Sequence, residues 1–199
     1  RDSVASRGLG DVYKRQDHTD IGGRDSAEGR LEGYFRRLDA DYPEDWYASG
    51  NEPCFGFPWL YNWLGQPWKT QEVIKRVLKE IYLDVSDGLP GNDDLGAMGA
   101  WYVWVSLGLY PEIPGVAGFA LSTPSFPYIC IHLPNGKEIV SESTQDGKPY
   151  ITSMRLDGKP VNGTWIPWEQ LSEGAHLKYH TSDKPNSKWG TRVAPPSYK

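Results

Sequence analysis

The stretch PWKTQEVIKRVLKEIYLDVSDGLPGNDDLGAMGAWYVWVSLGLYP, residues 67–111, decides the fold of this chain. Apolar residues recur every three to four positions from Val73 to Ile81, and lysine, arginine and glutamate fill the positions between them. This spacing predicts an amphipathic helix that begins at Pro67 and ends near Leu83. Its single apolar face has to pack against a neighbouring element.

A second helix is expected after the Gly/Pro-rich turn at residues 86–91. Asn92 or Asp93 is placed to cap its first turn, because Asx side chains accept hydrogen bonds from the free N–H groups there. The helix is expected to run to Leu107 and to end at Gly108. Its apolar positions occupy more than one stripe, which predicts burial between layers.

The N-terminal side is less regular. Helical spacing of apolar residues predicts a helix over residues 25–38, with Asp25 or Ser26 as N-cap. Prolines and glycines break residues 41–58 into a loop. Residues 1–16 follow no helical or strand period and resemble translated linker or adaptor sequence, so we expect the natural protein to continue upstream.

Beyond residue 114 the pattern changes to short β-branched and aromatic runs. A hairpin with a two-residue Asn135-Gly136 turn is expected, and Asp157-Gly158 signals another. The predicted class is therefore mainly α plus β. The predicted units are a helical one over residues 17–114 and a small antiparallel β region over residues 115–199 that packs on it.

Composition excludes several classes of partner. The net charge is −5 with 24% charged residues, so no broad basic face is available for nucleic acid or an anionic membrane. No apolar run approaches the about 20 residues of a membrane span, and the chain shows no signal peptide. Cys54 and Cys130 lie far apart in sequence, which favours structural thiols over a disulfide.

The loop around Glu52 has the residue types of a sugar site. Its carboxylate is held between Asn51 and Pro53, and Trp46 and other aromatic residues lie near it in sequence. Aromatic rings can stack on sugars. The alternative is that these rings fill gaps between helices, which is the commoner role of a single Trp.

Asn92, Asp93 and Asp94 lie where the second helix is expected to begin. Free N–H groups and the helix dipole favour negative charge there, and a general base has to be ionised. Plain helix capping is the competing interpretation for Asp93 and Asp94.

Several motifs in order resemble glycoside hydrolase family 92. They are GNEP at 50–53, LYNWLGQPWKTQ at 60–71, DGLPGNDDLG at 87–96 and GLYP at 108–111. The resemblance extends over about residues 20–190. It implies an inverting, calcium-dependent exo-α-mannosidase that acts on terminal mannose of glycans. The implied fold is an (α/α)6 toroid beside a β-sandwich, of which residues 17–114 would be the C-terminal helices.

The resemblance also implies roles for individual residues. Asp94 aligns with the general base, with Asn92 and Asp93 beside it. Asn51 and Glu52 align with a loop near the sugar or the metal. Trp46, close to this loop in sequence, is expected to contact the substrate as well. Calcium would be held near Glu52 and, through water, near Asp94.

The sequence departs from the family pattern at two points. Nothing before Gly50 reproduces the motif of the family's general acid, so we expect this chain to be inactive alone and to need the upstream β-sandwich and toroid helices. Gly99 replaces the small polar residue usual in the family. A non-catalytic carbohydrate-binding module and a truncated inactive fragment stay open as alternatives. The parent protein is expected to be secreted, periplasmic or on the cell surface.

Three histidines lie in the predicted strand region. His132, His176 and His180 have no convergent carboxylates in the sequence pattern, so they are expected to be solvated or structurally bonded. No metal site is expected there.

Overall fold

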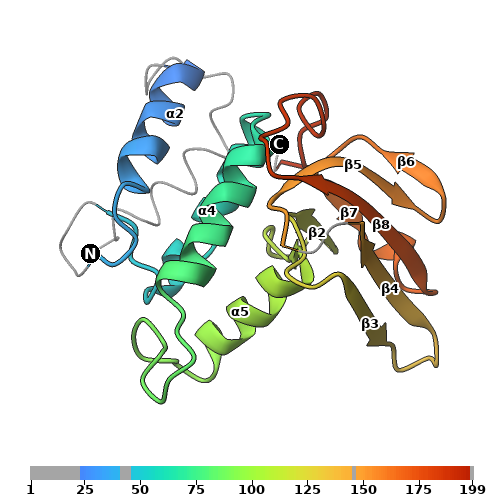
Figure 1. Ribbon diagram of the computed structural model, residues 1–199, viewed down its shortest axis with the longest axis horizontal. Coiled ribbons are helices and arrows are strands. Elements are labelled where there is room, and N and C mark those ends of the chain that lie inside the picture. Colours follow the sequence, from blue (N-terminus) through green and yellow to red (C-terminus); the bar gives the residue numbers. More distant parts are fainter. Residues whose placement is uncertain (1–22, 41–45, 145–146, 198–199) are drawn as a thin grey trace.

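The computed structural model describes residues 23–40, 46–144 and 147–197. The N-terminal segment assigned above to linker sequence lies outside these residues. Figure 1 shows helices α2, α4 and α5 on one side and the β-strands on the other. The helical elements are α2 (Gly23–Tyr34), η2 (Glu52–Cys54), η3 (Phe57–Trp59), α3 (Leu60–Trp63), α4 (Pro67–Glu80), α5 (Ala97–Leu107) and η4 (Trp168–Gln170). The strands are β1 (Leu109–Tyr110), β2 (Gly118–Leu121), β3 (Tyr128–His132), β4 (Glu138–Ser143), β5 (Tyr150–Leu156), β6 (Lys159–Val161), β7 (Trp165–Pro167) and β8 (Ala175–Ser182).

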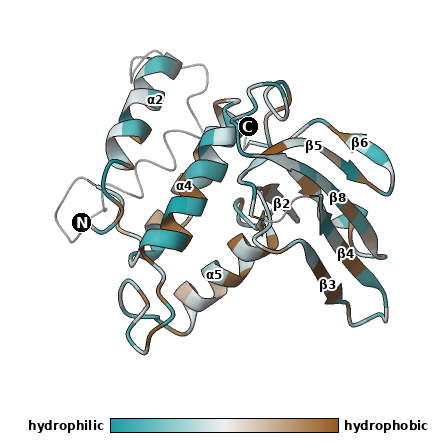
Figure 2. Ribbon diagram, viewed as in Figure 1, coloured by the Kyte–Doolittle hydropathy of each residue, from teal (hydrophilic) through white to brown (hydrophobic). Residues whose placement is uncertain are grey.

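The long helix α4 confirms the sequence prediction. Pro67 occupies its first turn, and the helix ends at Glu80, three residues before the predicted end. Its apolar stripe is buried, including Val73, Ile74 and Val77. Figure 2 shows α4 largely in hydrophilic teal, with pale and hydrophobic brown parts between.

The N-terminal region differs from its prediction. Helix α2 begins at Gly23 and ends at Tyr34, so Asp25 and Ser26 lie inside its first turn and neither is the N-cap. The predicted loop at 41–58 contains two 3-10 turns, η2 and η3, each with a proline at its first or second position. Proline fixes a helix-compatible φ, which explains why these short turns form where breakers predicted only a loop.

Helix α2 is held on α4 by charged side chains. Lys69 Nζ contacts Glu28 Oε1 at 2.6 Å and also pairs with Glu32. Arg76 Nη1 donates to the carbonyl oxygen of Phe35 at 2.9 Å. These contacts join segments about 40 residues apart at the helical side of the molecule.

The strands form two sheets rather than one antiparallel region. The smaller sheet has the order β1-β2-β7 and is antiparallel. The larger has the order β3-β4-β8-β5-β6, and β4 pairs with β8 in parallel. The prediction of an antiparallel region is therefore wrong for this pair, because a parallel partner distant in sequence leaves no local turn signal. The domain boundary placed at residue 114 stays a prediction.

The hairpin turns show where local signals succeed. Asp157 and Gly158 both have positive φ, 48° and 77°, as a two-residue hairpin turn requires. The loop of the first hairpin is longer than predicted. Leu133 N donates a hydrogen bond to Lys137 O at 2.8 Å, and this bond encloses a loop of three residues. Gly136 has φ 76° and closes this loop, so the predicted two-residue Asn-Gly turn is wrong while the hairpin itself is confirmed.

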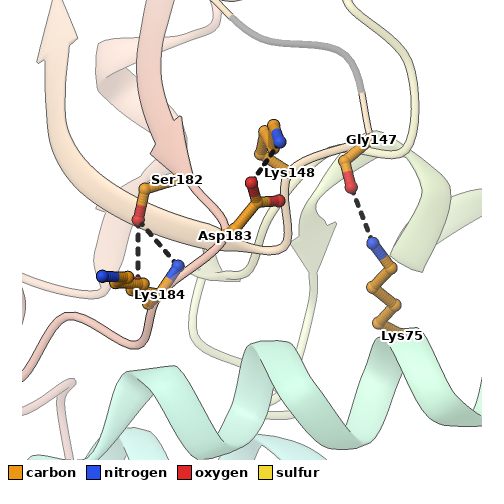
Figure 3. Close-up of polar contacts among 6 residues, drawn as sticks. All are labelled: Lys75, Gly147, Lys148, Ser182, Asp183 and Lys184. Atoms are coloured by element: carbon orange, nitrogen blue, oxygen red, sulfur yellow. Dashed lines mark hydrogen bonds and ion pairs between the residues drawn. The ribbon is translucent and has the colours of Figure 1, made fainter.

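Helix α4 is joined to the larger sheet by polar contacts. The buried Gln71 Oε1 accepts a hydrogen bond from Ile151 N at 3.0 Å. Lys75 Nζ donates to Gly147 O at 2.6 Å, next to the ion pair of Lys148 and Asp183 (Figure 3). Because backbone groups of β5 and the preceding loop are the partners, the position of the sheet relative to α4 is fixed.

Helix α5 lacks the polar face that α4 has. It carries no charged residue, and Tyr102 and Val103 are 42% and 57% exposed. Figure 2 shows α5 in pale to brown colours along most of its length. The prediction of burial between layers is met on one face only, where Met98, Trp101 and Val105 are buried. Across the described residues, no helix is long and apolar enough to cross a membrane.

Candidate active site

Two loops that carry the predicted site residues touch through their glycines. A Cβ on Gly50 would lie 2.6 Å from Pro90 O and 3.3 Å from Gly91 Cα. A Cβ on Gly91 would lie 3.2 Å from both Gly50 Cα and Gly50 O. Only glycine permits this approach. One backbone contact therefore brings together the starts of two segments, Asn51-Glu52 and Asn92 to Asp94.

The first loop presents Glu52 at the start of η2. Asn51 precedes it and is exposed, with its Nδ2 donating to Cys54 Sγ at 3.7 Å. Glu52 is half-buried, and its Oε1 atom is buried without a hydrogen-bond partner among the described residues. A buried carboxylate oxygen without a partner is costly unless a ligand or a cation satisfies it.

The aromatic residues of this loop are packing residues. Trp59 and Trp63 are 0% and 5% exposed, so neither ring is available to stack on a sugar. Trp59 stacks on Tyr110 with ring centroids 4.2 Å apart. Trp101 Nε1 donates to Phe55 O at 3.0 Å and holds α5 beneath the loop. Trp46 is half-buried and stays a candidate substrate contact.

The second loop differs from the predicted cap. Helix α5 begins at Ala97, and neither Asn92 nor Asp93 is its N-cap. Asp94, Leu95 and Gly96 have φ values of 31°, 62° and 86°, a left-handed run that delays the helix. Leucine resists this region because of its Cβ, whereas aspartate tolerates it. The turn is therefore strained at Leu95, the residue that follows Asp94.

The adjacent carboxylates Asp93 and Asp94 have different environments. Asp93 Oδ1 accepts a hydrogen bond from Gly99 N at 3.0 Å, so this side chain caps the third residue of α5 from outside the helix. Asp94 is exposed, as is Asn92. The capping interpretation thus accounts for Asp93 and does not account for Asp94.

Asp93 also faces the aromatic support of the site. Burial raises the pKa of Tyr82 well above its ordinary value, and the charge of Asp93 raises this pKa further. Tyr82 stacks on Trp101 at 5.4 Å, so this layer connects the second loop to the core of the helices.

Gly99 is explained only in part by this geometry. A Cβ there would meet the Asp93 carboxylate oxygens at 3.9 Å, which is ordinary van der Waals contact. The described surroundings therefore do not require glycine at this position. What the site uses from Gly99 is its N–H.

A hollow of about 230 Å³ lies beside the glycine contact. It is lined by Asp39, Ala40, Ser49, Gly50, Glu80, Ile81 and Pro90. Asn51, Glu52, Asn92 and Asp94 are not among these residues. The candidate side chains thus lie outside this hollow.

The sequence analysis missed one buried carboxyl group near the helices, that of Glu112. Glu112 is 6% exposed, and a Cβ on Gly56 would lie 2.5 Å from its Oε1. Its charge contributes, after burial, to raising the pKa of Tyr110. A glutamate between Pro111 and Ile113 in an otherwise apolar turn was the signal that could have identified it.

Metal-ligand atoms do not converge at the two loops. Within residues 23–40, 46–144 and 147–197, three side chains of His, Cys, Asp or Glu come together at a single place, Cys130, His132 and Glu138. The carboxylates of Glu52, Asp93 and Asp94 form no such group. The expectation that the strand-region histidines have no convergent carboxylates is wrong: Glu138 lies 3.0 Å from His132, and Glu142 lies 3.0 Å from His176.

Comparison with known proteins identifies the class and then the family. Residues 18–183 match the model of a glycosyl hydrolase catalytic domain, so this part of the chain is related to enzymes that hydrolyse glycosidic bonds. The matched model is that of family 92, and the chain belongs to glycosyl hydrolase family 92. The resemblance inferred from the sequence motifs is confirmed.

Individual relatives agree with this assignment. A protein of Arthroderma benhamiae described as an uncharacterized secreted glycosidase is 33% identical over 171 residues, which cover 82% of this chain and 22% of that protein. A family 92 α-mannosidase of Bacteroides thetaiotaomicron is 29% identical, with a TM-score of 0.83, covering 94% of this chain and 25% of that one. A family 92 inverting mannosidase of the same organism has a TM-score of 0.77 at 29% identity, covering 86% and 26%. The chain spans about a quarter of the length of these relatives.

Proposed function

We propose that this chain supplies the general base, Asp94, to an inverting, calcium-dependent exo-α-mannosidase. Two solved relatives are described as a family 92 α-mannosidase and a family 92 inverting mannosidase, and one family 92 structure contains mannoimidazole. Terminal α-mannosides of glycans are accordingly the proposed substrates.

The strained turn at Asp94 is the observation that carries this proposal. Asp94 and Leu95 keep left-handed φ values, which cost free energy at Leu95, and the Leu95 side chain is fully exposed, so its packing does not offset the cost. Such strain is common at functional sites, where it aims a side chain. Asp93 anchors the turn on α5 through Gly99 N, which leaves Asp94 available to a substrate.

In the proposed reaction, the Asp94 carboxylate accepts a proton from the attacking water. Water attacks from the face opposite the leaving group, which inverts the configuration at the anomeric carbon. The general acid lies about 6.5–9.5 Å away across the sugar, and we place it in a part of the protein outside this chain. Asn92 would orient the water or a sugar hydroxyl, with Trp46 against the sugar ring.

The residues near the glycine contact fit calcium in kind, because Glu52, Asn51 and Asp94 all offer hard oxygen atoms. The buried, unpartnered Oε1 of Glu52 is the observation in favour. Calcium requires six to eight oxygens, so most ligands would come from water, backbone and residues outside this chain. When bound, the ion would act as a Lewis acid beside the oxygen atoms of the terminal mannose.

The exposed apolar face of α5 is evidence for a larger domain in the parent protein. We propose that Tyr102 and Val103 pack against further helices of an (α/α)6 toroid, beside an upstream β-sandwich. The relatives are about four times as long as this chain, which is consistent with such partners. Because one relative is described as secreted, a secreted, periplasmic or cell-surface location is proposed for the parent protein.

The test uses the full-length protein and an α-mannoside substrate. Asp94→Asn is expected to lower kcat by roughly 10²–10⁴-fold while calcium-dependent sugar binding is retained. Asp87→Asn is the matched control, since Asp87 is an exposed aspartate in the same α4–α5 connection. NMR should show β-mannose as the first product. Near-normal turnover by Asp94→Asn would overturn the assignment.

The chain by itself is expected to show no hydrolysis, because the general acid is proposed to lie elsewhere. Sugar binding without hydrolysis in the full-length protein would support the alternative of a non-catalytic carbohydrate-binding module. A calorimetric titration with mannose, with and without calcium, measures this directly.

A further inference from the structure

Cys130, His132 and Glu138 meet on the exposed face of the β3–β4 hairpin. Residues two apart on a strand point to the same face, which places Cys130 beside His132. The β3–β4 register sets His132 directly opposite Glu138. The ligand atoms of all three side chains lie within 4.8 Å of one another, and His132 Nδ1 is 3.0 Å from Glu138 Oε1.

We propose that these three residues bind a zinc ion. A thiolate, an imidazole and a carboxylate are ligands that Zn²⁺ accepts together, whereas Ca²⁺ and Mg²⁺ prefer oxygen alone. This site is therefore distinct in chemistry from the calcium proposed at the two loops. Three protein ligands leave one tetrahedral position to water.

The separations suit a tetrahedral ion after small side-chain rotations. Bond lengths of about 2.0–2.3 Å place neighbouring ligand atoms about 3.4 Å apart. The observed separations range from 3.0 Å to no more than 4.8 Å. The side chains of His132 and Glu138 are 77% and 53% exposed, so they are free to make these adjustments.

The competing explanation is an ordinary cross-strand pair of histidine and glutamate. The same sheet face offers a comparison, since His176 Nε2 lies 3.0 Å from Glu142 Oε2 without belonging to a three-ligand group among the described residues. The two pairs differ in the thiol of Cys130. Cys54, the other cysteine, is buried and 2% exposed, so it is not available to an ion from solvent.

The experiment is a calorimetric titration of the whole chain with ZnCl₂ under reducing conditions. One ion per chain is expected to bind. Cys130→Ser and His132→Gln should each weaken zinc affinity at least about tenfold, because loss of even an outer-shell partner of a metal ligand costs about 10–100-fold. His176→Gln is the matched control and should bind as the unsubstituted chain does. A large excess of CaCl₂ should leave zinc binding unchanged.

A second measurement reports the thiolate directly. Co²⁺ bound at this site should give a sulfur-to-cobalt absorption band that Cys130→Ser removes and Cys54→Ala retains. Thermal melts of Cys130→Ser, His132→Gln and His176→Gln should match, because these three side chains lie on the exposed face of the larger sheet. No zinc binding by the unsubstituted chain, or equal affinity for Cys130→Ser, His132→Gln and His176→Gln, would overturn the proposal.

Discussion

Gly50 and Gly91 pack backbone against backbone, and this contact sets the distance between the two loops of the candidate active site. The backbone around each glycine occupies the space that a Cβ on the other would fill. The GNEP and GNDD motifs therefore share a physical reason for their first residue.

Replacing Gly50 by alanine should destabilise the protein by about 1–3 kcal/mol, because the new Cβ would overlap backbone atoms of Pro90. Urea denaturation followed by tryptophan fluorescence measures this. Gly29→Ala is the control: Gly29 lies in α2 with nothing within 4 Å of a Cβ, so a gain of up to about 1 kcal/mol is expected. Similar effects of both substitutions would contradict the packing argument.

Asp93→Ala should lower the free energy of unfolding by about 1 kcal/mol, since Gly99 N loses its acceptor at the beginning of α5. Asp87→Ala, in the preceding exposed turn, should change it little. Chemical denaturation of the two variants side by side is the measurement. A neutral Asp93→Ala would mean that the turn is held by other contacts.

Leu95→Asn should stabilise the protein by about 0.5–1 kcal/mol, because asparagine tolerates the left-handed region that leucine resists. The leucine side chain is fully exposed, so its removal loses no packing. Leu89→Asn serves as the matched change on the same loop without a positive φ. A rise in Tm for Leu95→Asn alone is the expected outcome, and no difference between the two would refute strain at this turn.

Gln71→Ala should cost about 1–3 kcal/mol, since it leaves the buried N–H of Ile151 without a partner. Lys79→Ala changes an exposed residue on the same helix and should be nearly neutral. Amide hydrogen exchange would localise the effect, with loss of protection at Ile151 expected only for Gln71→Ala. Uniform loss across the sheet would argue for global destabilisation instead.

Alkaline pH should destabilise the fold. Burial raises the pKa of Tyr47 and Tyr179 well above their ordinary value. A raised folded-state pKa leaves stability intact below the unfolded pKa of about 10, and stability falls as pH rises above it.

The midpoints of urea unfolding, measured between pH 8 and pH 11, test whether stability falls in this direction. Tyr179→Phe should shift the alkaline loss to higher pH, because the buried Tyr179 hydroxyl has no hydrogen-bond partner in the described part of the chain. An alkaline loss of stability that is the same in Tyr179→Phe and the unsubstituted chain would contradict it.

The elements predicted well are those set by local sequence. Period and proline position predicted α4, and Asp157-Gly158 predicted the β5–β6 hairpin. The start of α5 was wrong because the capping signal at Asp93 acts from outside a left-handed turn that no propensity reveals. The parallel pairing of β4 with β8 joins strands more than thirty residues apart, for which the sequence holds no local signal.

The candidate site shows the same division. The motifs identified the two loops, but only the structure shows that Asp93 caps α5 while Asp94 is exposed. The Cys130, His132 and Glu138 group was missed because the predicted two-residue turn at Asn135-Gly136 would pair His132 with Ile139, whereas the observed three-residue loop pairs it with Glu138.

The central place of β8 has a consequence for biosynthesis. Strand β8 lies between β4 and β5 in the larger sheet. A nascent chain that ends at about residue 170 therefore has two separate hairpins with unpaired inner edges. The larger sheet can be completed only when residues 175–182 have emerged. Nascent chains stalled before this point should therefore depend on chaperones, whereas those stalled after it should not.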